Sequence, residues 1–353
     1  MEKAHDQRPA RTTIKNVAKD AGVSVAAVSK VLRNAYGVSD ALRAKVQSTI
    51  ERLGYRPSTA ARGMRGRTFT IGVLLVEIAN PFVPQIIDGI NEVLADSNYR
   101  ALIGVGQSMA TLEAALLESM ISYHMDGLIL LAPQLPGAEL ARYAKQIPMV
   151  VIGHHEATAT AFDTVNSDDQ EGAALVVRTF LQSGHRDIGM LSLVTDDPLS
   201  TNVVSQREIG FRKAMQRAGL SSDEKISRLS FDAQLHRNEV ATFLKSDKRP
   251  RALFCWSDLD AVHVLDSAKR LDLRVPEDLS VIGYDNSSPA ALASIDLSSI
   301  DQSGHRLGSL ASENLLSRIG GRNIASHILI EPTLIARQTH LVGLSADGRT
   351  RVS

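Results

Sequence analysis

From Thr68 onward the chain alternates short apolar runs with amphipathic stretches, and this alternation constrains the fold more than any other feature. The runs are TIGVLLV, RALIGV, GLILLA and PMVVIG, then DIGMLSL, ISRLSF, RALFCW and LSVIGY. Short apolar runs that are each followed by a helix-like segment are typical of buried parallel strands. The two series of runs contain more strands than one sheet of modest size would hold, so the pattern predicts two doubly wound α/β lobes. Ligands are expected at the carboxyl ends of the strands and in the crevice between the lobes.

The first 67 residues have a different pattern, which predicts three short helices around one small core. Thr13, Ser24 and Ser39 can cap the three helices, Gly22 allows a sharp turn between the first two, and Gly54 ends the third. The residues expected on the buried faces are Ile14, Val17, Ala18, Ala21, Val28, Val31, Leu32, Leu42, Val46, Ile50 and Leu53. Two helices joined by a tight turn form a helix-turn-helix.

The second of these helices leaves an unusual set of side chains facing water. If Val28 and Val31 face the core, then the residues facing out are Val25, Ala26, Ser29, Lys30 and Arg33. Small side chains allow a helix to approach the floor of the DNA major groove, where apolar groups contact thymine methyls and polar groups reach base edges or phosphates. The alternative is a small helical module without a ligand.

Charge is distributed unevenly along the chain. Lys and Arg number 39, as do Asp and Glu, but residues 1–67 hold 14 basic against 5 acidic residues. This asymmetry indicates an anionic partner, either nucleic acid or a membrane surface, unless the segment is only a solvated basic arm.

The number of cysteines and the hydropathy of the chain indicate the cellular compartment in which the protein is expected. Cys255 is the single cysteine, which excludes an intramolecular disulfide and a cysteine-based zinc site. The first thirty residues hold no apolar signal core, and no run reaches the ~18 apolar residues of a membrane span. We therefore expect a cytoplasmic protein.

The stretches TIKNVAKDAGVSVAAVSKVL and VSDALRAKVQSTIERLGYRPSTAARGMR closely resemble the DNA-binding headpiece of LacI-type bacterial transcription regulators. The resemblance implies that the recognition helix contacts the operator, that Thr13 and Ser24 contact phosphate, and that Ser58 to Met64 form a hinge helix. Together with the outward-facing residues, the DNA-binding set is Thr13, Ser24, Val25, Ala26, Ser29, Lys30, Arg33, Ser58, Ala61 and Met64. Ala27 stands where the family usually has Thr, and Met64 where it usually has Leu.

The hinge segment is too short to be helical by itself. About seven residues that include Gly63 form too few hydrogen bonds to offset helix nucleation. We expect it to order only on DNA, with Met64 as an apolar wedge in the minor groove. A plain linker is the alternative.

The motifs IANPFV, MDGLIL, VNSDDQEGA, GHRDI, REIGF and VPEDLSVIGYDN resemble the periplasmic-binding-protein-like effector domain of the same family, in the same order. Ser257-Asp258 replaces its usual Asn-Asp pair. The effector-binding residues implied by position are Phe82, His154, Asp168, Arg207, Phe231, Ser257, Asp285 and Gln302.

The residue types at these positions favour a hydroxylated ligand. Arg207 is a planar donor suited to vicinal hydroxyls or a carboxylate, and Asp285 accepts hydroxyl hydrogens. Phe82 and Phe231 offer apolar faces for a ring, although core packing is the alternative for each. A salt bridge between the lobes is the alternative for Arg207 and Asp285.

The sequence gives little support to catalysis. His154-His155-Glu156 is a polar loop rather than a metal site, because neighbouring residues do not converge on one ion. The GVG run at Gly104 to Gly106 lacks a third glycine, and we find no nucleophile paired with a base. We expect no enzyme activity, cofactor or metal. The alternative is a cytoplasmic sugar-binding or sugar-modifying α/β protein with a basic arm.

These observations predict a ligand-responsive transcription factor with an all-α helix-turn-helix headpiece and an α/β core of two doubly wound lobes. It is expected to be a repressor that binds a palindromic operator as a homodimer, with a small sugar-like effector that alters lobe closure. The expected parts are an arm (1–12), the helix-turn-helix domain (13–57), the hinge (58–67), the effector and dimerisation domain (68–346) and a tail (347–353).

Overall fold

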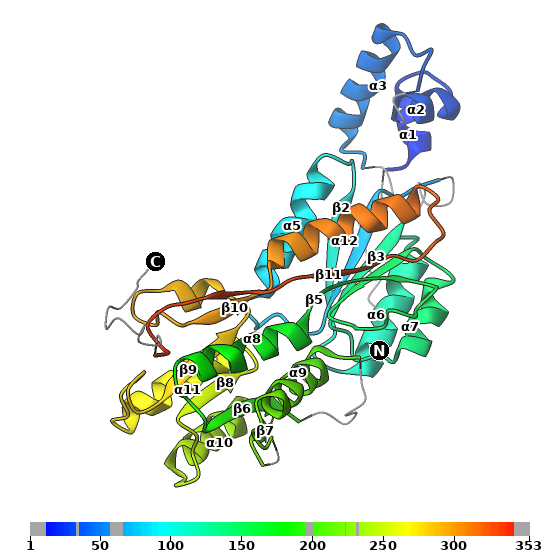
Figure 1. Ribbon diagram of the computed structural model, residues 1–353. Coiled ribbons are helices and arrows are strands. Elements are labelled where there is room, and N and C mark those ends of the chain that lie inside the picture. The colour runs from blue at the N-terminus through cyan, green and yellow to red at the C-terminus, as the bar shows by residue number, and fades with distance from the viewer. Residues whose placement is uncertain are drawn as a thin grey trace, which may run out of the picture. The chain divides into compact units, whose positions relative to one another are not determined.

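The computed structural model describes residues 12–32, 35–56, 66–194, 201–222, 224–230 and 233–341, apart from the side chains of residues 233–236. The chain divides into two compact units, Met1–Thr68 and Phe69–Ser353 (Figure 1).

The first unit contains the three helices that the caps predicted, which are α1 (Ile14–Asp20), α2 (Val25–Leu32) and α3 (Asp40–Leu53). The hydroxyl of Ser39 accepts the backbone N–H of Leu42 at 3.3 Å. Gly54 ends α3 with φ at 57°, a left-handed conformation that glycine adopts at little cost.

The core of the first unit consists of the predicted apolar faces. Val17, Val28 and Val46 are fully buried, one from each helix. An ion pair between Arg52 and Asp20 joins α3 to the last turn of α1 at the surface. The fold of this unit therefore follows from caps and helical periodicity.

The first lobe of the second unit is built on a six-stranded parallel sheet in the order β11-β5-β4-β3-β1-β2. Its strands and helices are β1 (Thr70–Leu75), α5 (Val83–Ala95), β2 (Arg100–Val105), α6 (Ala110–Ser122), β3 (Gly127–Leu131), α7 (Gly137–Ala144), β4 (Met149–Ile152), β5 (Asp163–Ser167), α12 (Gly304–Ile319) and β11 (His327–Ile330).

Alternate residues of these strands pack against opposite layers of helices. Ile129 and Val150 belong to the cluster under α5 and α12, whereas Leu128 and Val151 belong to the cluster under α6 and α7. Because both faces are covered, the central strands are apolar at every position, which explains the uninterrupted runs in the sequence. In Figure 1, α12 lies beside α5 although the two are far apart along the chain.

The second lobe repeats this arrangement around the order β12-β10-β9-β8-β6-β7, in which only the β10–β12 pair is antiparallel among the described strands. Its elements are α8 (Asp169–Gln182), β6 (Ile188–Leu193), α9 (Val203–Arg217), β7 (Ile226–Leu229), α10 (Ala233–Lys245), β8 (Ala252–Cys255), α11 (Asp258–Arg270), β9 (Ser280–Tyr284), the 3-10 turn η1 (Ser288–Ala291), β10 (Ser299–Asp301) and β12 (Thr333–Ile335).

The two predicted series of strands and the two doubly wound lobes are thus confirmed. The chain, however, passes between the lobes more than once. Within the described residues it crosses three times, between β5 and α8, between β10 and α12, and between β11 and β12. The strands that the sequence did not reveal are β5, β10, β11 and β12. These strands are short, and β5 carries polar residues at buried positions.

Candidate functional site

The outward face of α2 carries the side chains expected there. Val28 and Val31 are buried at 0% and 6% exposure, whereas Val25, Ala26 and Lys30 are exposed. Ser29 is half-buried. The predicted orientation of the helix is therefore confirmed, with two apolar side chains of its first turn facing water beside a cation.

Thr13 and Ser24 lie at the N-termini of α1 and α2. The hydroxyl of Ser24 accepts the backbone N–H of Ala27 at 3.1 Å. Thr13 forms a capping box with Asn16, which donates its backbone N–H to the Thr13 hydroxyl and accepts the backbone N–H of Thr13. Both residues are exposed, at positions where backbone N–H groups favour anions such as phosphate.

Several predicted site residues lie outside the described residues, and their roles stay predictions. They are Arg33, Ser58, Ala61, Met64 and Phe231, and the expected hinge helix lies outside them as well.

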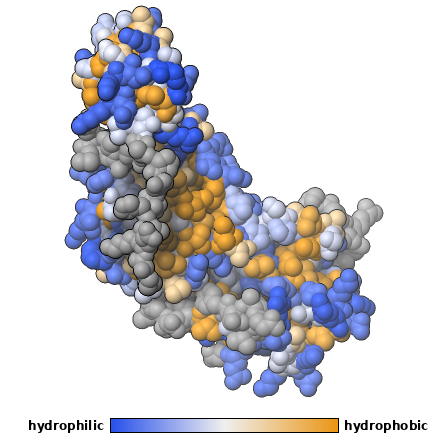
Figure 2. Space-filling view, turned by 180° about the vertical axis from the view of Figure 1, so that it is seen from behind, coloured by the Kyte–Doolittle hydropathy of each residue, from blue (hydrophilic) through white to orange (hydrophobic). Residues whose placement is uncertain are grey.

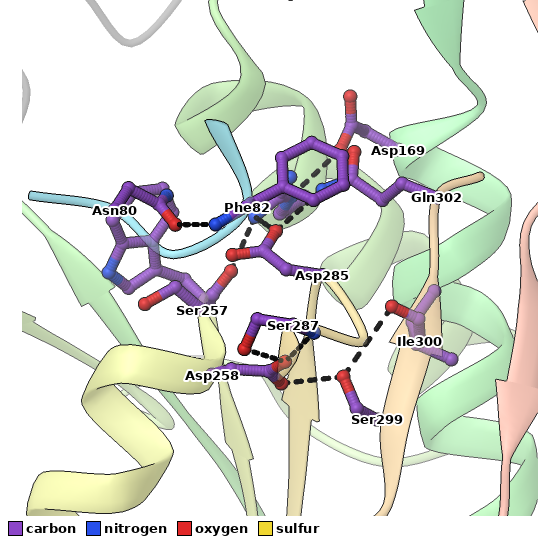
Figure 3. A network of polar contacts seen from close by, with 12 residues as sticks. Asn80, Phe82, Asp169, Ser257, Asp258, Asp285, Ser287, Ser299, Ile300 and Gln302 are labelled. Atoms are coloured by element: carbon purple, nitrogen blue, oxygen red, sulfur yellow. Dashed lines mark hydrogen bonds and ion pairs between the residues drawn. The ribbon is translucent and has the colours of Figure 1, made fainter. Parts of the chain in front are cut away.

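A second group of predicted residues belongs to a buried network in the second unit that includes Arg207 of α9. Figure 3 labels several of its members, among them Asp169, Asp285 and Gln302. The Nε of Arg207 donates to Oδ1 of Asp169 at 2.7 Å, and its Nη1 donates to the backbone carbonyl of Trp256. The same Nη1 lies 4.0 Å from Oδ1 of Asp285. Arg207 is only 3% exposed, so these carboxylates and carbonyl replace water around the guanidinium.

Two aromatic rings flank the guanidinium. Its central carbon lies 3.8 Å from the ring centroid of Tyr284 and 5.5 Å from that of Trp256. These distances allow cation–π attraction, which is strongest when the cation is shielded from water. The rings and the Asp169 pair hold Arg207 in one orientation.

Asp285 follows β9 directly and lies beneath the ring of Phe82 in Figure 3. Its Oδ1 accepts a hydrogen bond from Nε2 of Gln302 at 2.6 Å. Asp285 has φ at 118°, and Asn286 follows at 46°, so two non-glycine residues have strained backbones at this site. Such strain persists only where surrounding contacts enforce it.

Asp258 supplies those contacts from the N-terminus of α11. Its Oδ2 accepts the backbone N–H and the hydroxyl of Ser287 at 2.7 and 2.9 Å, and its Oδ1 accepts the hydroxyl of Ser299 at 2.5 Å. Ser299 in turn accepts the backbone N–H of Asn286 at 3.0 Å. Burial raises the pKa of Asp258 to about 6, although these hydrogen bonds act in the opposite direction.

The two lobes meet at this loop. Nε2 of Gln85, on α5 of the first lobe, donates to the backbone carbonyl of Asn286 at 3.0 Å. Phe82 also comes from the first lobe and packs against Gly304, where a Cβ atom would stand 2.6 Å from the ring. Arg207 and Asp285, by contrast, both belong to the second lobe, so the alternative of a salt bridge between the lobes is wrong for this pair.

The two acidic residues beside Arg207 have different ionisation preferences. Burial would raise the pKa of Asp169, but the charges and hydrogen bonds of Arg207 and His155 outweigh it, so that the pKa lies below its ordinary value. Burial raises the pKa of Asp285 well above its ordinary value, because Arg207 and Gln302 compensate only in part. The pKa values of the two neighbouring carboxyl groups are therefore shifted in opposite directions.

Asp169 is a residue that the sequence analysis missed, since it singled out the preceding Asp168. In the structure Asp168 caps α8, and its Oδ1 accepts the backbone N–H of Glu171 at 3.0 Å. It lines a surface cavity of about 360 Å³ together with His155, Gln170, Glu171, Ala174, Gln206, Gly210, Lys213, Arg217 and Leu329. The sequence signal was the adjacent pair of aspartates, of which one caps the helix and the next turns inward.

His154 and Ser257 make contacts of their own. The ring of His154 lies 3.1 Å from the Thr201 hydroxyl and 3.0 Å from Glu156, and burial lowers its pKa. Ser257 caps α11 by accepting the backbone N–H of Asp260 at 3.2 Å. His155, rather than His154, reaches the network, because its Nε2 lies 2.7 Å from Oδ2 of Asp169.

Two negative findings concern the described residues alone. No helix among them has both the length and the apolar character needed to cross a membrane. Nor do they bring together three or more His, Cys, Asp or Glu side chains that could hold a metal ion.

Comparison with protein-family models gives two matches. Residues 13–58 match the model described as bacterial regulatory proteins, lacI family, and residues 177–340 match a periplasmic binding protein-like domain. Among curated proteins, the HTH-type transcriptional repressor PurR of Photorhabdus laumondii is 32% identical over 342 residues, which cover 96% of this chain and 99% of that protein. PurR of Salmonella arizonae is 33% identical with the same coverage.

Solved structures show the same fold. A complex of the transcriptional regulator CelR with cellobiose matches with a TM-score of 0.69 and 26% identity, over 93% of this chain and 100% of that chain. The lac repressor dimer bound to operator and the anti-inducer ONPF matches with a TM-score of 0.80 and 22% identity, over 94% and 100% of the two chains.

Proposed function

The chain belongs to the LacI family of bacterial regulatory proteins, and we propose that it is a cytoplasmic repressor that binds a palindromic operator as a homodimer and responds to a small, neutral, hydroxylated effector. In this proposal residues 13–57 bind DNA, residues 58–67 form the hinge, and residues 68–346 bind the effector and dimerise. The arm (1–12) and the tail (347–353) flank them.

The exposed face of α2 is the observation that carries DNA binding. Val25 and Ala26 are short enough for the helix to enter the major groove, and Lys30 supplies a cation on the same surface. Burying two apolar side chains against thymine methyls offers a use for a face that otherwise costs free energy in water. We assign Thr13 and Ser24 to phosphate contacts.

The homodimer is supported by the edge of the first sheet. The edge strand β2 exposes Leu102 and Ile103 at 52% and 51%. An exposed apolar edge strand invites association unless another surface covers it. The face of the second unit shown in Figure 2 carries a broad area of hydrophobic side chains, and we assign that area to contact with a second copy.

The charge balance around Arg207 favours a neutral effector. The guanidinium is already paired with Asp169, and Asp285 places a second carboxyl group beside it. A carboxylate or phosphate would have to compete with both groups for Arg207. Hydroxyl groups, by contrast, both donate and accept hydrogen bonds and fit Arg207, Asp285 and Gln302. The likeness to a regulator solved with cellobiose supports this ligand class.

The site is nearly closed to water in this structure. Arg207, Asp285 and Gln302 are 3%, 2% and 5% exposed, so an effector can reach them only if the lobes move apart. The Gln85–Asn286 hydrogen bond crosses between the lobes at this point and would break on opening. Binding between the lobes would therefore change their closure, and through it the affinity for DNA.

The operator and the effector are tested separately. Selection from random DNA duplexes should yield a site with two-fold symmetry. Light scattering should show that the full chain binds this site as a dimer, and the substitution Leu102→Glu should shift the protein toward monomers. Neutral sugars and polyols should raise the melting temperature, whereas matched sugar acids and sugar phosphates should not. A selected site without two-fold symmetry would contradict the dimeric repressor. Stabilisation only by anions would contradict the ligand class.

A further inference from the structure

Trp256 is the one tryptophan in the sequence and follows β8 directly, at the carboxyl end of a strand in the second lobe. Its backbone carbonyl accepts a hydrogen bond from Arg207, and its ring faces the guanidinium of the same residue. The indole therefore belongs to the surroundings of the buried network.

The indole N–H of Trp256 is buried, and no acceptor lies within hydrogen-bonding reach among the described residues. A buried donor without an acceptor is costly, and folded proteins leave few of them. The unmatched N–H is informative here because the charged and amide side chains of the network are paired. Asp169, Arg207, Asp285 and Gln302 all have hydrogen-bond partners.

Other buried polar atoms without a partner carry less information. Ser192, Ser312 and Tyr284 are hydroxyls, which rotate and can both donate and accept. The Nε of Arg249 is also only a donor, but that guanidinium is held by a hydrogen bond from its Nη1 to the backbone carbonyl of Leu244. The indole nitrogen of Trp256 is the one donor of its side chain, and its N–H direction is fixed by a ring whose orientation packing determines. Trp256 packs against the hydrophobic clusters on both faces of the second sheet, so the ring has little freedom to turn.

We propose that Trp256 is a specificity-determining residue of the effector site, whose indole N–H donates to a hydroxyl or carbonyl oxygen of the bound neutral ligand. This inference rests on the proposed function, because it takes the network around Arg207 as the effector site. It adds a requirement to the ligand, which is an acceptor oxygen within reach of the indole N–H, in addition to the hydroxyls that Asp285 and Gln302 would contact. A neutral molecule without such an oxygen would bind poorly.

The first test uses the natural protein. D-glucose, D-galactose, D-ribose, cellobiose, myo-inositol, adenine and guanine are tested for their effect on the melting temperature, and tryptophan emission is recorded in parallel. Since Trp256 is the only tryptophan, every compound that stabilises the protein through this site should also change the emission. A stabilising compound that leaves the emission unchanged would overturn the proposal.

The second test uses Trp256→Phe, which keeps an aromatic ring and removes the N–H. For a compound that stabilises the natural protein, calorimetry should show affinity reduced about tenfold, the loss expected for one hydrogen bond to a buried donor. Binding to the selected operator without effector should not change. Tyr123→Phe, an exposed ring change at the end of α6, is the matched control and should leave both affinities unchanged.

The outcomes separate this proposal from the one on which it rests. Equal affinity of Trp256→Phe and the natural protein overturns the role of Trp256 and leaves the regulator intact. If no neutral compound stabilises the natural protein and only anions do, the ligand class fails, and the role of Trp256 fails with it. Loss of operator binding by Trp256→Phe without effector would show a structural role instead.

Discussion

The outward face of α2 and the network around Arg207 differ in their exposure to water. Val25, Ala26 and Lys30 are exposed, and none of them is needed to build the core of the first unit. Arg207, Asp169 and Asp285 are almost fully buried, and each depends on the others to offset its desolvation. Substitutions on the exposed face of α2 are therefore expected to leave stability unchanged, whereas substitutions in the network around Arg207 are expected to lower it.

The largest effect is expected from Arg207→Met. Removal of the guanidinium leaves the ionised Asp169 buried with His155 as its remaining partner, so the second unit should lose about 3–5 kcal/mol of its free energy of unfolding. Urea denaturation followed by Trp256 emission measures this loss. Arg212→Met, a half-exposed change on the same helix, is the control. If the unfolding free energy fell by less than ~1 kcal/mol while effector binding was abolished, Arg207 would be needed for the ligand and not for stability. The buried network would then not differ from the exposed face of α2 in its effect on stability.

An intermediate effect that depends on pH is expected from Asp258→Asn. The pKa of Asp258 is raised from an ordinary 3.8 to about 6 in the folded protein, so the folded state binds this proton more tightly than the unfolded state. The resulting stabilisation is present at low pH and is lost as pH rises from about 4 to above 6. The difference in unfolding free energy, natural protein minus variant, should therefore fall by up to about 3 kcal/mol between pH 4 and pH 7.

Urea denaturation of the two proteins at several pH values measures that difference. Asp266→Asn, an exposed change on the same helix, controls for the loss of a charge. A difference that stays constant with pH would show that folding does not shift the pKa of Asp258. Buried Asp258 would then titrate like an exposed acidic group, contrary to this prediction.

The smallest effect on stability is expected from Lys30→Ala. Operator affinity should fall by ~1–3 kcal/mol if Lys30 reaches a base edge, while the unfolding free energy of the first unit changes by less than about 0.5 kcal/mol. Fluorescence anisotropy at fixed salt and thermal melts followed by circular dichroism measure the two quantities. Lys248→Ala, an exposed change in the second unit, should alter neither. If Lys30→Ala destabilised the first unit and left operator affinity unchanged, Lys30 would serve stability rather than DNA binding, contrary to this prediction.

Much of the first unit could be predicted because its determinants are local. The hydroxyls of Thr13, Ser24 and Ser39 cap helices through backbone N–H groups three residues later. The buried faces follow from the helical repeat, so Val28 and Val31 could be oriented without knowledge of their partners. Six of the eight predicted strands, which are β1, β3, β4, β6, β8 and β9, were evident for a similar reason, since strands buried on both faces have few polar positions. The edge strands β2 and β7 were recognised from their apolar residues, although they are partly exposed.

The strands β5, β10, β11 and β12 could not be predicted in this way. Asn166 in β5 is polar but buried, because its amide bonds the backbone of residues 153 and 154. The exposed positions of β11 place its edge toward water. Such strands are defined by the strands beside them, which a single sequence does not specify.

From the sequence alone, the helix-turn-helix, the exposed face of α2 and the two-lobed α/β architecture could be predicted, and Arg207 and Asp285 could be selected as candidate site residues. Only the tertiary structure decided that Asp169 rather than Asp168 pairs with Arg207, that Arg207 and Asp285 lie in one lobe, and that the indole of Trp256 joins them. Arg207 is 38 residues from Asp169 and 49 from Trp256 along the chain. Caps and helical faces depend on residues within one turn, whereas contacts at these separations depend on how sheets and helices pack, and local preference carries no record of that packing.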